Sequence, residues 1–342
     1  MRPKRSPAAI LALALAVVAG AVAAGCGEKD ETSSGGATEP FSLALDFYVN
    51  PDHAGIYTGL ERGFFEQAGL DVQPQVPSDP SAPIKQVAAG SVDLAISYEP
   101  EVVLARDQGL PVVAVAALVP SPLTSLISLP EADVQEVADL RGKTVATAGI
   151  PYQTDFLETM LEGAGVEHED VEQVDVGLNL LPAILSGRAD AILGGFLNVE
   201  GVDLEERGKN PRVVPVDELG VPTYDELVLV ADSERVADDP EAIRLFIAAL
   251  ERGTRAAVDD PAGATDAVLA AGEGLDPKLT KAEVESTLPL LLPDTGNRPY
   301  GYMDPAEWEA FAGFFADRGL IERRPTADDL LNNELLPGEI PD

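Results

Sequence analysis

Segments typical of β-strands alternate with segments typical of α-helices from residue 41 onward, and this alternation restricts the possible folds more than any other feature. Residues 41–47 form an apolar run of strand length. Residues 53–68 then place Ile56, Leu60 and Phe64 on one face of a helix. Strands that alternate with helices in this way are typical of parallel α/β sheets. The chain is therefore predicted to be an α/β protein.

The alternation runs through two similar cycles and ends in a helical tail. Further strands are predicted at 70–76, 93–97, 112–117, 144–148, 171–176, 189–193 and 228–231, and further helices at 82–89, 99–107, 154–162, 180–186, 239–258, 281–288 and 305–317. A chain of this length exceeds a typical domain of about 100–150 residues, so we expect two lobes. The fold class is then α/β, with two lobes of parallel or mixed sheets flanked by helices.

The lobe boundaries follow from where the two cycles meet. We assign residues 41–127 and 228–342 to the first lobe and residues 128–227 to the second, with crossovers near 126–128 and 224–228. Ligands of open α/β sheets bind at the carboxyl ends of the strands, and here those ends are expected to face each other between the lobes.

The N-terminus has the parts of a secretory signal. Arg2, Lys4 and Arg5 precede an apolar stretch from residue 8 to about residue 24, and the chain's only cysteine, Cys26, follows directly. The stretch is shorter than the ~20 residues that span a bilayer.

We therefore predict a lipoprotein signal peptide over 1–25 and acylation of Cys26. Residues 26–40 are rich in Ser, Gly, Thr and acidic residues, and this composition predicts a flexible linker. The protein is expected to be lipid-anchored on the extracytoplasmic face of the cell membrane, periplasmic or at the cell surface. One acyl chain binds a membrane only reversibly, so several chains are expected on Cys26.

The composition excludes several classes of function. Acidic residues outnumber basic ones 59 to 23, so nucleic acid is not expected as a partner. The charges are spread in pairs such as Asp238-Asp239, which indicates a solvated acidic surface. Cys26 is the only cysteine, and His53 and His168 are the only histidines. No metal site, no catalytic triad and no cofactor is expected, and we expect a monomer.

Polar and aromatic residues follow two predicted strands of the first lobe. Residues 46–57 leave a strand, turn at Asn50-Pro51 and enter a helix, and residues 97–100 repeat this arrangement. A flat heteroaromatic ring needs faces to stack on and a carboxylate that accepts its amino hydrogens. Candidate ligand-binding residues in this lobe are Asp46, Phe47, Asn50, His53, Tyr57, Tyr98 and Glu99.

The second lobe is expected to supply the opposite wall. Pro151 and Tyr152 follow one of its predicted strands, and Asn198 and Glu200 follow another. These four residues complete the predicted site.

Several candidates in the first lobe also have a purely structural explanation. Phe47 and Tyr57 could be ordinary core residues, because aromatic side chains on apolar faces usually are. Asp46, His53 and Glu99 could serve as helix caps.

Six short stretches resemble one known family, and they lie at residues 46–57, 77–80, 88–93, 95–100, 149–152 and 186–191. They resemble the periplasmic solute-binding proteins of the SsuA/thiamine-pyrimidine group, and most closely the lipoproteins that bind formylaminopyrimidine. The resemblance covers nearly the whole mature chain. It implies a type II periplasmic-binding-protein fold, a thiamine-precursor pyrimidine as ligand, and an ABC permease with a cytoplasmic ATPase as partner.

The same fold includes an enzyme, the fungal thiamine-pyrimidine synthase, which consumes a histidine and a lysine-bound pyridoxal phosphate. Its pattern, placed on residues 93–96, puts Ser97 at the lysine position and Glu101 at the histidine position. Its cysteine-rich iron-binding run has no counterpart after Cys26. Without the amine and the imidazole that chemistry has no reactive groups here, so we predict a binding protein and no enzyme.

Three alternatives to a pyrimidine receptor remain at this stage. Sulfonate and nitrate binders need convergent cationic or N–H donors, whereas Asp46, Glu99 and the aromatic residues favour a neutral or cationic ring. Riboflavin binders also need stacking and hydrogen bonds, so they are harder to separate. A lipoprotein with a purely structural role would not require such groups at strand ends of both lobes.

Overall fold

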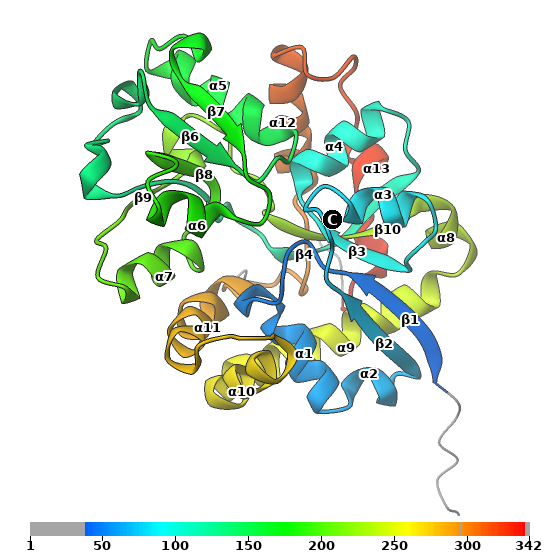
Figure 1. The fold of residues 1–342 in the computed structure, drawn as a ribbon. Coiled ribbons are helices and arrows are strands. Elements are labelled where there is room, and N and C mark those ends of the chain that lie inside the picture. Colours follow the sequence, from blue (N-terminus) through cyan, green and yellow to red (C-terminus); the bar gives the residue numbers. More distant parts are fainter. Residues whose placement is uncertain (1–37, 295, 339–342) are drawn as a thin grey trace, which may run out of the picture. The chain divides into compact units, whose positions relative to one another are not determined.

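Two five-stranded sheets organise the chain in a computed structural model that describes residues 38–294 and 296–338 (Figure 1). The predicted signal peptide, Cys26 and most of the predicted linker lie outside these residues. The first sheet has the strand order β2-β1-β3-β10-β4 and the second β7-β6-β8-β5-β9. Both sheets are mixed, and the predicted two-lobed α/β fold with a helical C-terminal region is confirmed.

In each sheet the strands from one cycle of the chain run parallel to one another. One strand, which the chain enters from a crossover between the sheets, runs antiparallel to them. β1 pairs in parallel with β2 and β3, and β10 runs antiparallel to β3 and β4. β6 pairs in parallel with β7 and β8, and β5 runs antiparallel to β8 and β9. The strands are β1 (Glu39–Ala44), β2 (Leu70–Gln75), β3 (Leu94–Ser97), β4 (Val112–Val119), β5 (Thr124–Ser128), β6 (Thr144–Thr147), β7 (Glu172–Asp175), β8 (Ala191–Phe196), β9 (Arg212–Pro215) and β10 (Leu227–Asp232).

Helices flank both sheets. They are α1 (Ala54–Glu61), α2 (Phe64–Gln67), α3 (Pro83–Ala88), α4 (Glu99–Asp107), α5 (Tyr152–Gly163), α6 (Leu180–Leu185), α7 (Glu200–Glu206), α8 (Ser233–Asp238), α9 (Pro240–Asp259), α10 (Pro261–Ala271), α11 (Pro277–Leu291), α12 (Pro305–Asp317) and α13 (Ala327–Leu330). The single helix predicted over 53–68 is divided into α1 and α2 by Gly63, whose φ of 67° is not helical.

Four helices of the C-terminal region begin with an Asp-Pro pair, which explains part of the acidic composition. Proline occupies the first turn of α9, α10, α11 and α12, where a missing N–H costs nothing. The preceding Asp260, Asp276 and Asp304 also accept hydrogen bonds from backbone N–H groups of the first turn. Local sequence therefore fixes where these helices start.

The two crossovers between the sheets are joined by one carboxylate. Glu226, fully buried just before β10, accepts the backbone N–H groups of Leu123 and Thr124, each at 2.7 Å. It also accepts the hydroxyls of Thr124 and Tyr224 at 2.9 Å. Because Leu123 ends the crossover from β4, Thr124 begins β5, and Glu226 belongs to the return crossover, this carboxylate joins the two connections to each other.

The predicted crossover at 126–128 differs from the observed one. Residues 126–128 lie inside β5, where they pair with β8 and β9. The observed connection comes earlier, between Val119 and Thr124, and includes Pro120 and Pro122. A strand of Thr, Ser, Leu, Ile and Ser has too little apolar content to be distinguished from a connection by pattern alone.

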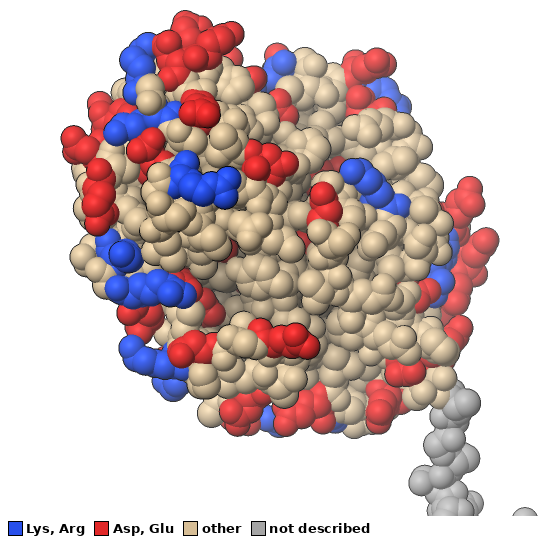
Figure 2. Space-filling model, viewed as in Figure 1, with Lys and Arg blue, Asp and Glu red and all other residues tan. Residues whose placement is uncertain are grey.

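Most charged side chains are at the surface, and Figure 2 shows them mainly around the rim of the viewed face, with a largely uncharged middle. Nine carboxyl groups are nevertheless buried, whereas no lysine or arginine of the described residues is buried to that degree. The nine are Asp46, Asp52, Glu99, Glu101, Glu200, Asp203, Asp225, Glu226 and Glu283. None of the helices in the described ranges has the length and apolar content needed to cross a membrane.

Candidate ligand-binding site

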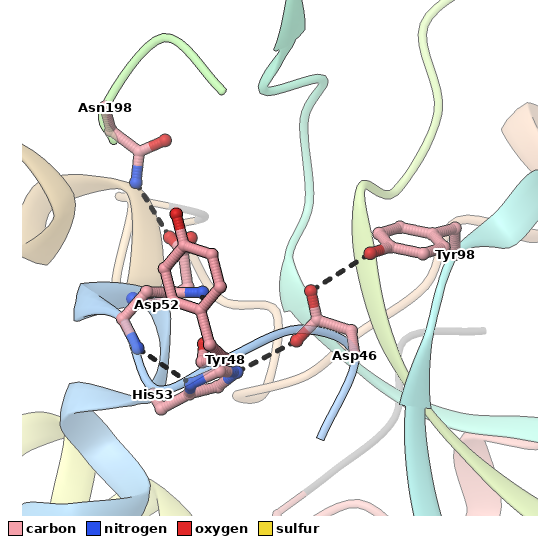
Figure 3. A network of polar contacts seen from close by, with 7 residues as sticks. Asp46, Tyr48, Asp52, His53, Tyr98 and Asn198 are labelled. Atoms are coloured by element: carbon pink, nitrogen blue, oxygen red, sulfur yellow. Dashed lines mark hydrogen bonds and ion pairs between the residues drawn. The ribbon is translucent and has the colours of Figure 1, made fainter. Parts of the chain in front are cut away.

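Asp46 lies at the centre of a buried polar network at the carboxyl end of the first sheet (Figure 3). It comes two residues after β1, and its Oδ1 is 2.9 Å from Nε2 of His53. Its Oδ2 accepts a hydrogen bond of 3.0 Å from the hydroxyl of Tyr98, which directly follows the neighbouring strand β3. The predicted convergence of these two strand ends is therefore present in the structure.

The turn after β1 orients His53 toward Asp46. Asn50 caps the short 3₁₀ helix η1 (Pro51–His53), and its Oδ1 accepts the backbone N–H of Asp52 at 2.8 Å. The backbone N–H of Asn50 donates to Nδ1 of His53 at 3.3 Å. Since Nδ1 accepts, Nε2 carries the proton and donates to Asp46. His53 is thus a neutral hydrogen-bond donor that holds the carboxylate of Asp46 in place.

A pocket opens beside Asp46 and is lined by residues of both lobes. It contains about 390 Å³ of space that no atom fills, some of it open to solvent. The lining residues from the first lobe are Asp46, Phe47, Asn50 and Tyr98, and those from the second lobe are Ala148, Ile150, Tyr152, Gln153, Gly194, Phe196, Val199 and Glu200. The residues of the second lobe follow β6 or lie in and just after β8, so the strand-end rule holds there too.

Hydrogen bonds to the backbone fix the polar residues of the second wall. Oε1 of Gln153 accepts the N–H of Ala148 at 2.9 Å, and Oε2 of Glu200 accepts the N–H of Phe196 at 2.8 Å. Gly194 has a φ of 105°, and a Cβ there would lie 2.3 Å from the amide nitrogen of Gln153. The position therefore requires glycine both for its backbone and for the close approach of Gln153.

The pocket combines aromatic faces with acidic groups. The rings of Tyr98 and Tyr152 are 5.8 Å apart at an angle of 59°. Burial raises the pKa of both tyrosines, so they remain neutral hydroxyls. Burial also raises the pKa of Glu200 to about 7. Asp46 and Glu200 are the acidic residues of the lining, which includes no lysine or arginine. Such a site suits a neutral or cationic ring that donates hydrogen bonds.

The predicted site residues fall into two groups. Asp46, Phe47, Asn50, Tyr98, Tyr152 and Glu200 line the pocket, and His53, Tyr57, Glu99, Pro151 and Asn198 do not. His53 lies behind Asp46, and the half-buried ring of Tyr57 meets His53 edge-on at 6.4 Å. Pro151 is exposed. Asn198 is fully buried and bonds to residues of the first lobe.

Glu99 does not line the pocket, although its position after β3 predicts that it would. Its Oε2 accepts the backbone N–H of Asp225 at 2.7 Å, while Asp225 accepts the indole N–H of Trp308 at 2.7 Å. Burial, and secondarily the charge of Asp225, raise the pKa of Glu99 well above its usual value. The side chain of Glu99, the first residue of α4, therefore bonds to the return crossover, and Asp225 links this crossover to α12.

Sequence reasoning missed six lining residues, namely Ala148, Ile150, Gln153, Gly194, Phe196 and Val199. Ala148, Ile150, Gly194 and Val199 carry no chemical signal of their own. The polar Gln153 and the aromatic Phe196 do, and their places after β6 and at the end of β8 were the signal that could have found them.

The two positions aligned with the synthase residues form a separate buried pair. Oγ of Ser97 donates to Oε2 of Glu101 at 2.7 Å, and burial raises the pKa of Glu101 to about 7. Neither residue lines the pocket. In the described ranges no group of His, Cys, Asp or Glu side chains is arranged to hold a metal ion.

The two mixed sheets and the pocket between strand ends of both lobes define the class, a protein with the periplasmic-binding-protein fold. Among solved structures, the alkanesulfonate-binding protein SsuA from Xanthomonas axonopodis pv. citri has this fold with a TM-score of 0.67 and 16% identity, covering 87% of this chain and 100% of that one. The chain belongs to the family described as NMT1/THI5 like, whose model matches residues 50–264.

Two relatives match most of the chain. The formylaminopyrimidine-binding protein of Halalkalibacterium halodurans is 35% identical over 326 residues, which cover 95% of this chain and 98% of the relative. A protein of Haemophilus influenzae named for thiamine biosynthesis is 36% identical over 288 residues, which cover 84% of this chain and 90% of the relative. The predicted resemblance is thereby confirmed.

The family also contains enzymes. A 4-amino-5-hydroxymethyl-2-methylpyrimidine phosphate synthase of Aspergillus parasiticus is 26% identical over 238 residues, which cover 66% of this chain and 69% of the relative.

Proposed function

We propose that this protein is the solute-binding lipoprotein of an ABC importer, and that it binds a thiamine-precursor pyrimidine of the formylaminopyrimidine or hydroxymethylpyrimidine type between its two lobes. The name of the Halalkalibacterium halodurans relative, which is similar along nearly its whole length, supports this ligand class. The partner would be a membrane permease with a cytoplasmic ATPase. Hinge motion about the two crossovers would enclose and release the ligand.

The composition of the pocket lining is the observation that carries the proposal. An aminopyrimidine offers two flat faces and amino hydrogens, and the pocket offers Tyr98, Tyr152 and Phe196 beside the carboxylate of Asp46. His53 and Tyr98 already orient Asp46, so ligand binding does not carry the entropic cost of ordering this side chain.

The alternative ligands fit this lining less well. Sulfonate and nitrate would face Asp46 and Glu200 without an arginine or lysine of the lining to neutralise them. The ring system of riboflavin carries one N–H and several acceptor atoms, so it offers fewer donors to the carboxyl groups of Asp46 and Glu200 than an aminopyrimidine does.

Binding without catalysis fits the residues at the positions used by the synthase. A Schiff base needs an amine, and Ser97 supplies a hydroxyl that donates to Glu101 instead. Glu101 has no imidazole to contribute. We therefore propose a receptor that releases its ligand unchanged.

Titration calorimetry of the purified protein with a panel of ligands tests the proposal. Formylaminopyrimidine or hydroxymethylpyrimidine is expected to bind, and riboflavin, taurine and nitrate are not. Asp46→Asn is expected to weaken pyrimidine binding by about 1.5–3 kcal/mol, roughly 10- to 150-fold, because a hydrogen bond to a charged group is lost.

The matched control is Asp71→Asn, since Asp71 is an exposed carboxylate on β2 outside the pocket. Tight binding of riboflavin or a sulfonate without pyrimidine binding would refute the ligand assignment. Conversion of the pyrimidine or of pyridoxal phosphate to a new product would refute the absence of catalysis.

Membrane attachment through Cys26 is a separate part of the proposal. Cys26→Ser is expected to move the protein from the membrane fraction to the soluble extracytoplasmic fraction while its ligand affinity stays unchanged, because the acyl chains supply the anchor. Metabolic labelling with a clickable fatty acid, followed by fractionation, measures acylation and membrane attachment, and calorimetry measures the ligand affinity. Label that persists in the serine variant would contradict this assignment.

A further inference from the structure

Asn198 connects the two lobes beside the pocket. It follows β8 of the second lobe, is fully buried, and donates from Nδ2 to Oδ1 of Asp52 at 2.8 Å, as Figure 3 shows. The same nitrogen donates to Oγ1 of Thr287 at 2.8 Å. Asp52 lies in η1 and Thr287 in α11, so both acceptors belong to the first lobe. Asn198, a residue of the second lobe, is thus bonded to two separate elements of the first lobe.

We propose that Asn198 is an interlobe latch, which stabilises the closed arrangement of the lobes through Asp52 and Thr287 without contacting the ligand. Asn198 is absent from the pocket lining, although its neighbours Phe196, Val199 and Glu200 are part of it. The effect of the latch on affinity rests on the proposed function, whereas its effect on the lobes does not.

The direction of both hydrogen bonds is fixed by their surroundings. The hydroxyl of Thr287 donates to the backbone carbonyl of Glu283 at 2.8 Å, one turn earlier in α11. Its oxygen must therefore accept from Asn198. A primary amide has two N–H groups, and both are used, one toward Thr287 and one toward Asp52. Separation of the lobes would break the two bonds together.

Acidic groups are concentrated around the latch, and one arginine offsets part of their charge. α7 of the second lobe packs against α11, and this contact brings the carboxyl groups of Glu200, Asp203 and Glu283 close to one another, while Arg207 forms an ion pair with Asp203. Burial, Asp203 and Glu200 raise the pKa of Glu283 to about 8. Lys278 and Glu206 form an ion pair of 2.6 Å across the same helices, but it lies at the surface, where such pairs contribute little.

The latch is also incomplete, which makes it reversible. Among the described residues, Oδ2 of Asp52 and Oδ1 of Asn198 are buried without a hydrogen-bond partner. Leaving polar atoms unpaired is unfavourable, and water would reach both when the lobes separate. The unfavourable burial of these two unpaired atoms thus partly offsets the two hydrogen bonds that favour closure. A receptor that must also open requires such a balance.

Distances between spin labels on the two lobes test the latch in the full chain. Cys26→Ser removes the only native thiol, and Glu66→Cys and Glu169→Cys introduce exposed attachment sites, one on each lobe. In ligand-free protein, Asn198→Ala is expected to lower the population with the short distance at least about tenfold. Thr287→Val should act in the same direction, and adding it to Asn198→Ala should have no further effect, because the partner is already gone.

Thr265→Val is the matched control, because Thr265 is a buried helical threonine of α10 that bonds to the carbonyl four residues earlier, as Thr287 does. It is expected to leave the distances unchanged. Thr287→Val also serves if Asn198→Ala does not fold.

Calorimetry on the same variants separates the possible outcomes. Weaker pyrimidine binding by Asn198→Ala with unchanged ligand-free distances would make Asn198 a ligand contact and overturn the latch. Unchanged distances and unchanged affinity would overturn it as well. Shifted distances in a protein that binds no pyrimidine would support the latch and refute the proposed function.

Discussion

Replacing Glu226 with alanine is expected to lower the free energy of unfolding by at least about 3 kcal/mol, because two buried backbone donors would lose their acceptor at a cost of about 1–3 kcal/mol each. These donors are the N–H groups of Leu123 and Thr124. The hydroxyls of Thr124 and Tyr224 would lose the same acceptor. Urea denaturation followed by circular dichroism measures the change.

Two further variants make this result specific to the hydrogen bonds by which Glu226 joins the two crossovers. Burial raises the pKa of Glu226 to about 7, so Glu226→Gln resembles the protonated form and keeps an oxygen for the two backbone donors. It is expected to cost less than half of the alanine change. Glu218→Ala, at an exposed position shortly before the same crossover, should alter stability by no more than about 0.5 kcal/mol. A loss below about 1 kcal/mol for Glu226→Ala would show that Glu226 does not hold the crossovers together.

Raising the pH from 5 to 8 is expected to destabilise the protein by at least about 3 kcal/mol, the value for one carboxyl group whose pKa is raised by about 2.5 units on folding. Burial raises the pKa of Glu101, Glu200 and Glu226 from 4.5 to about 7, and that of Glu283 to about 8. Between these values the folded state binds more protons than the unfolded state. The stabilisation is therefore complete below about pH 4.5 and is lost as the pH rises through 7 and 8.

Urea denaturation at pH 5, 6, 7 and 8 measures this dependence. Glu283→Gln is expected to make it shallower between pH 7 and 8, because it removes the group with a pKa of about 8. Glu285→Gln on the exposed side of the same helix serves as the control. The overall charge of −36 acts in the same direction, since repulsion grows as further carboxyl groups ionise. A constant or rising stability from pH 5 to pH 8 would show that the buried carboxyl groups stay ionised.

Predictions from sequence succeeded where a segment carries its own signal. Uninterrupted apolar runs located β3, β4 and β8, and the proline at residue 240 marked the start of α9. β5 and β9 were missed because β5 is rich in Ser and Thr, and β9 has only two apolar residues between an arginine and a proline. These short strands are defined by pairing with β8 and with each other, which local pattern does not report.

The candidate site could also be predicted from the sequence only where a residue's position in the chain carries a signal. Asp46 and Tyr98 follow apolar strands, so their place at a sheet edge could be predicted, and the structure joins them by a hydrogen bond. Glu99 follows the same strand, yet it bonds to Asp225, which lies 126 residues away. Adjacent residues at a strand end point in different directions, and the neighbours that they meet decide their roles.

By itself the sequence determined the α/β alternation, the helix starts and the acidic, aromatic character of the strand ends, because each of these depends on residues close together in the chain. Only the tertiary structure decided which carboxyl groups are buried away from water. It also decided that Glu226 joins the crossovers and that Asn198 bonds to Asp52, 146 residues away in the chain. Burial and pairing depend on what the rest of the fold brings to a side chain. A count of 59 acidic residues predicts a solvated surface, and the fold alone determines which of them water cannot reach.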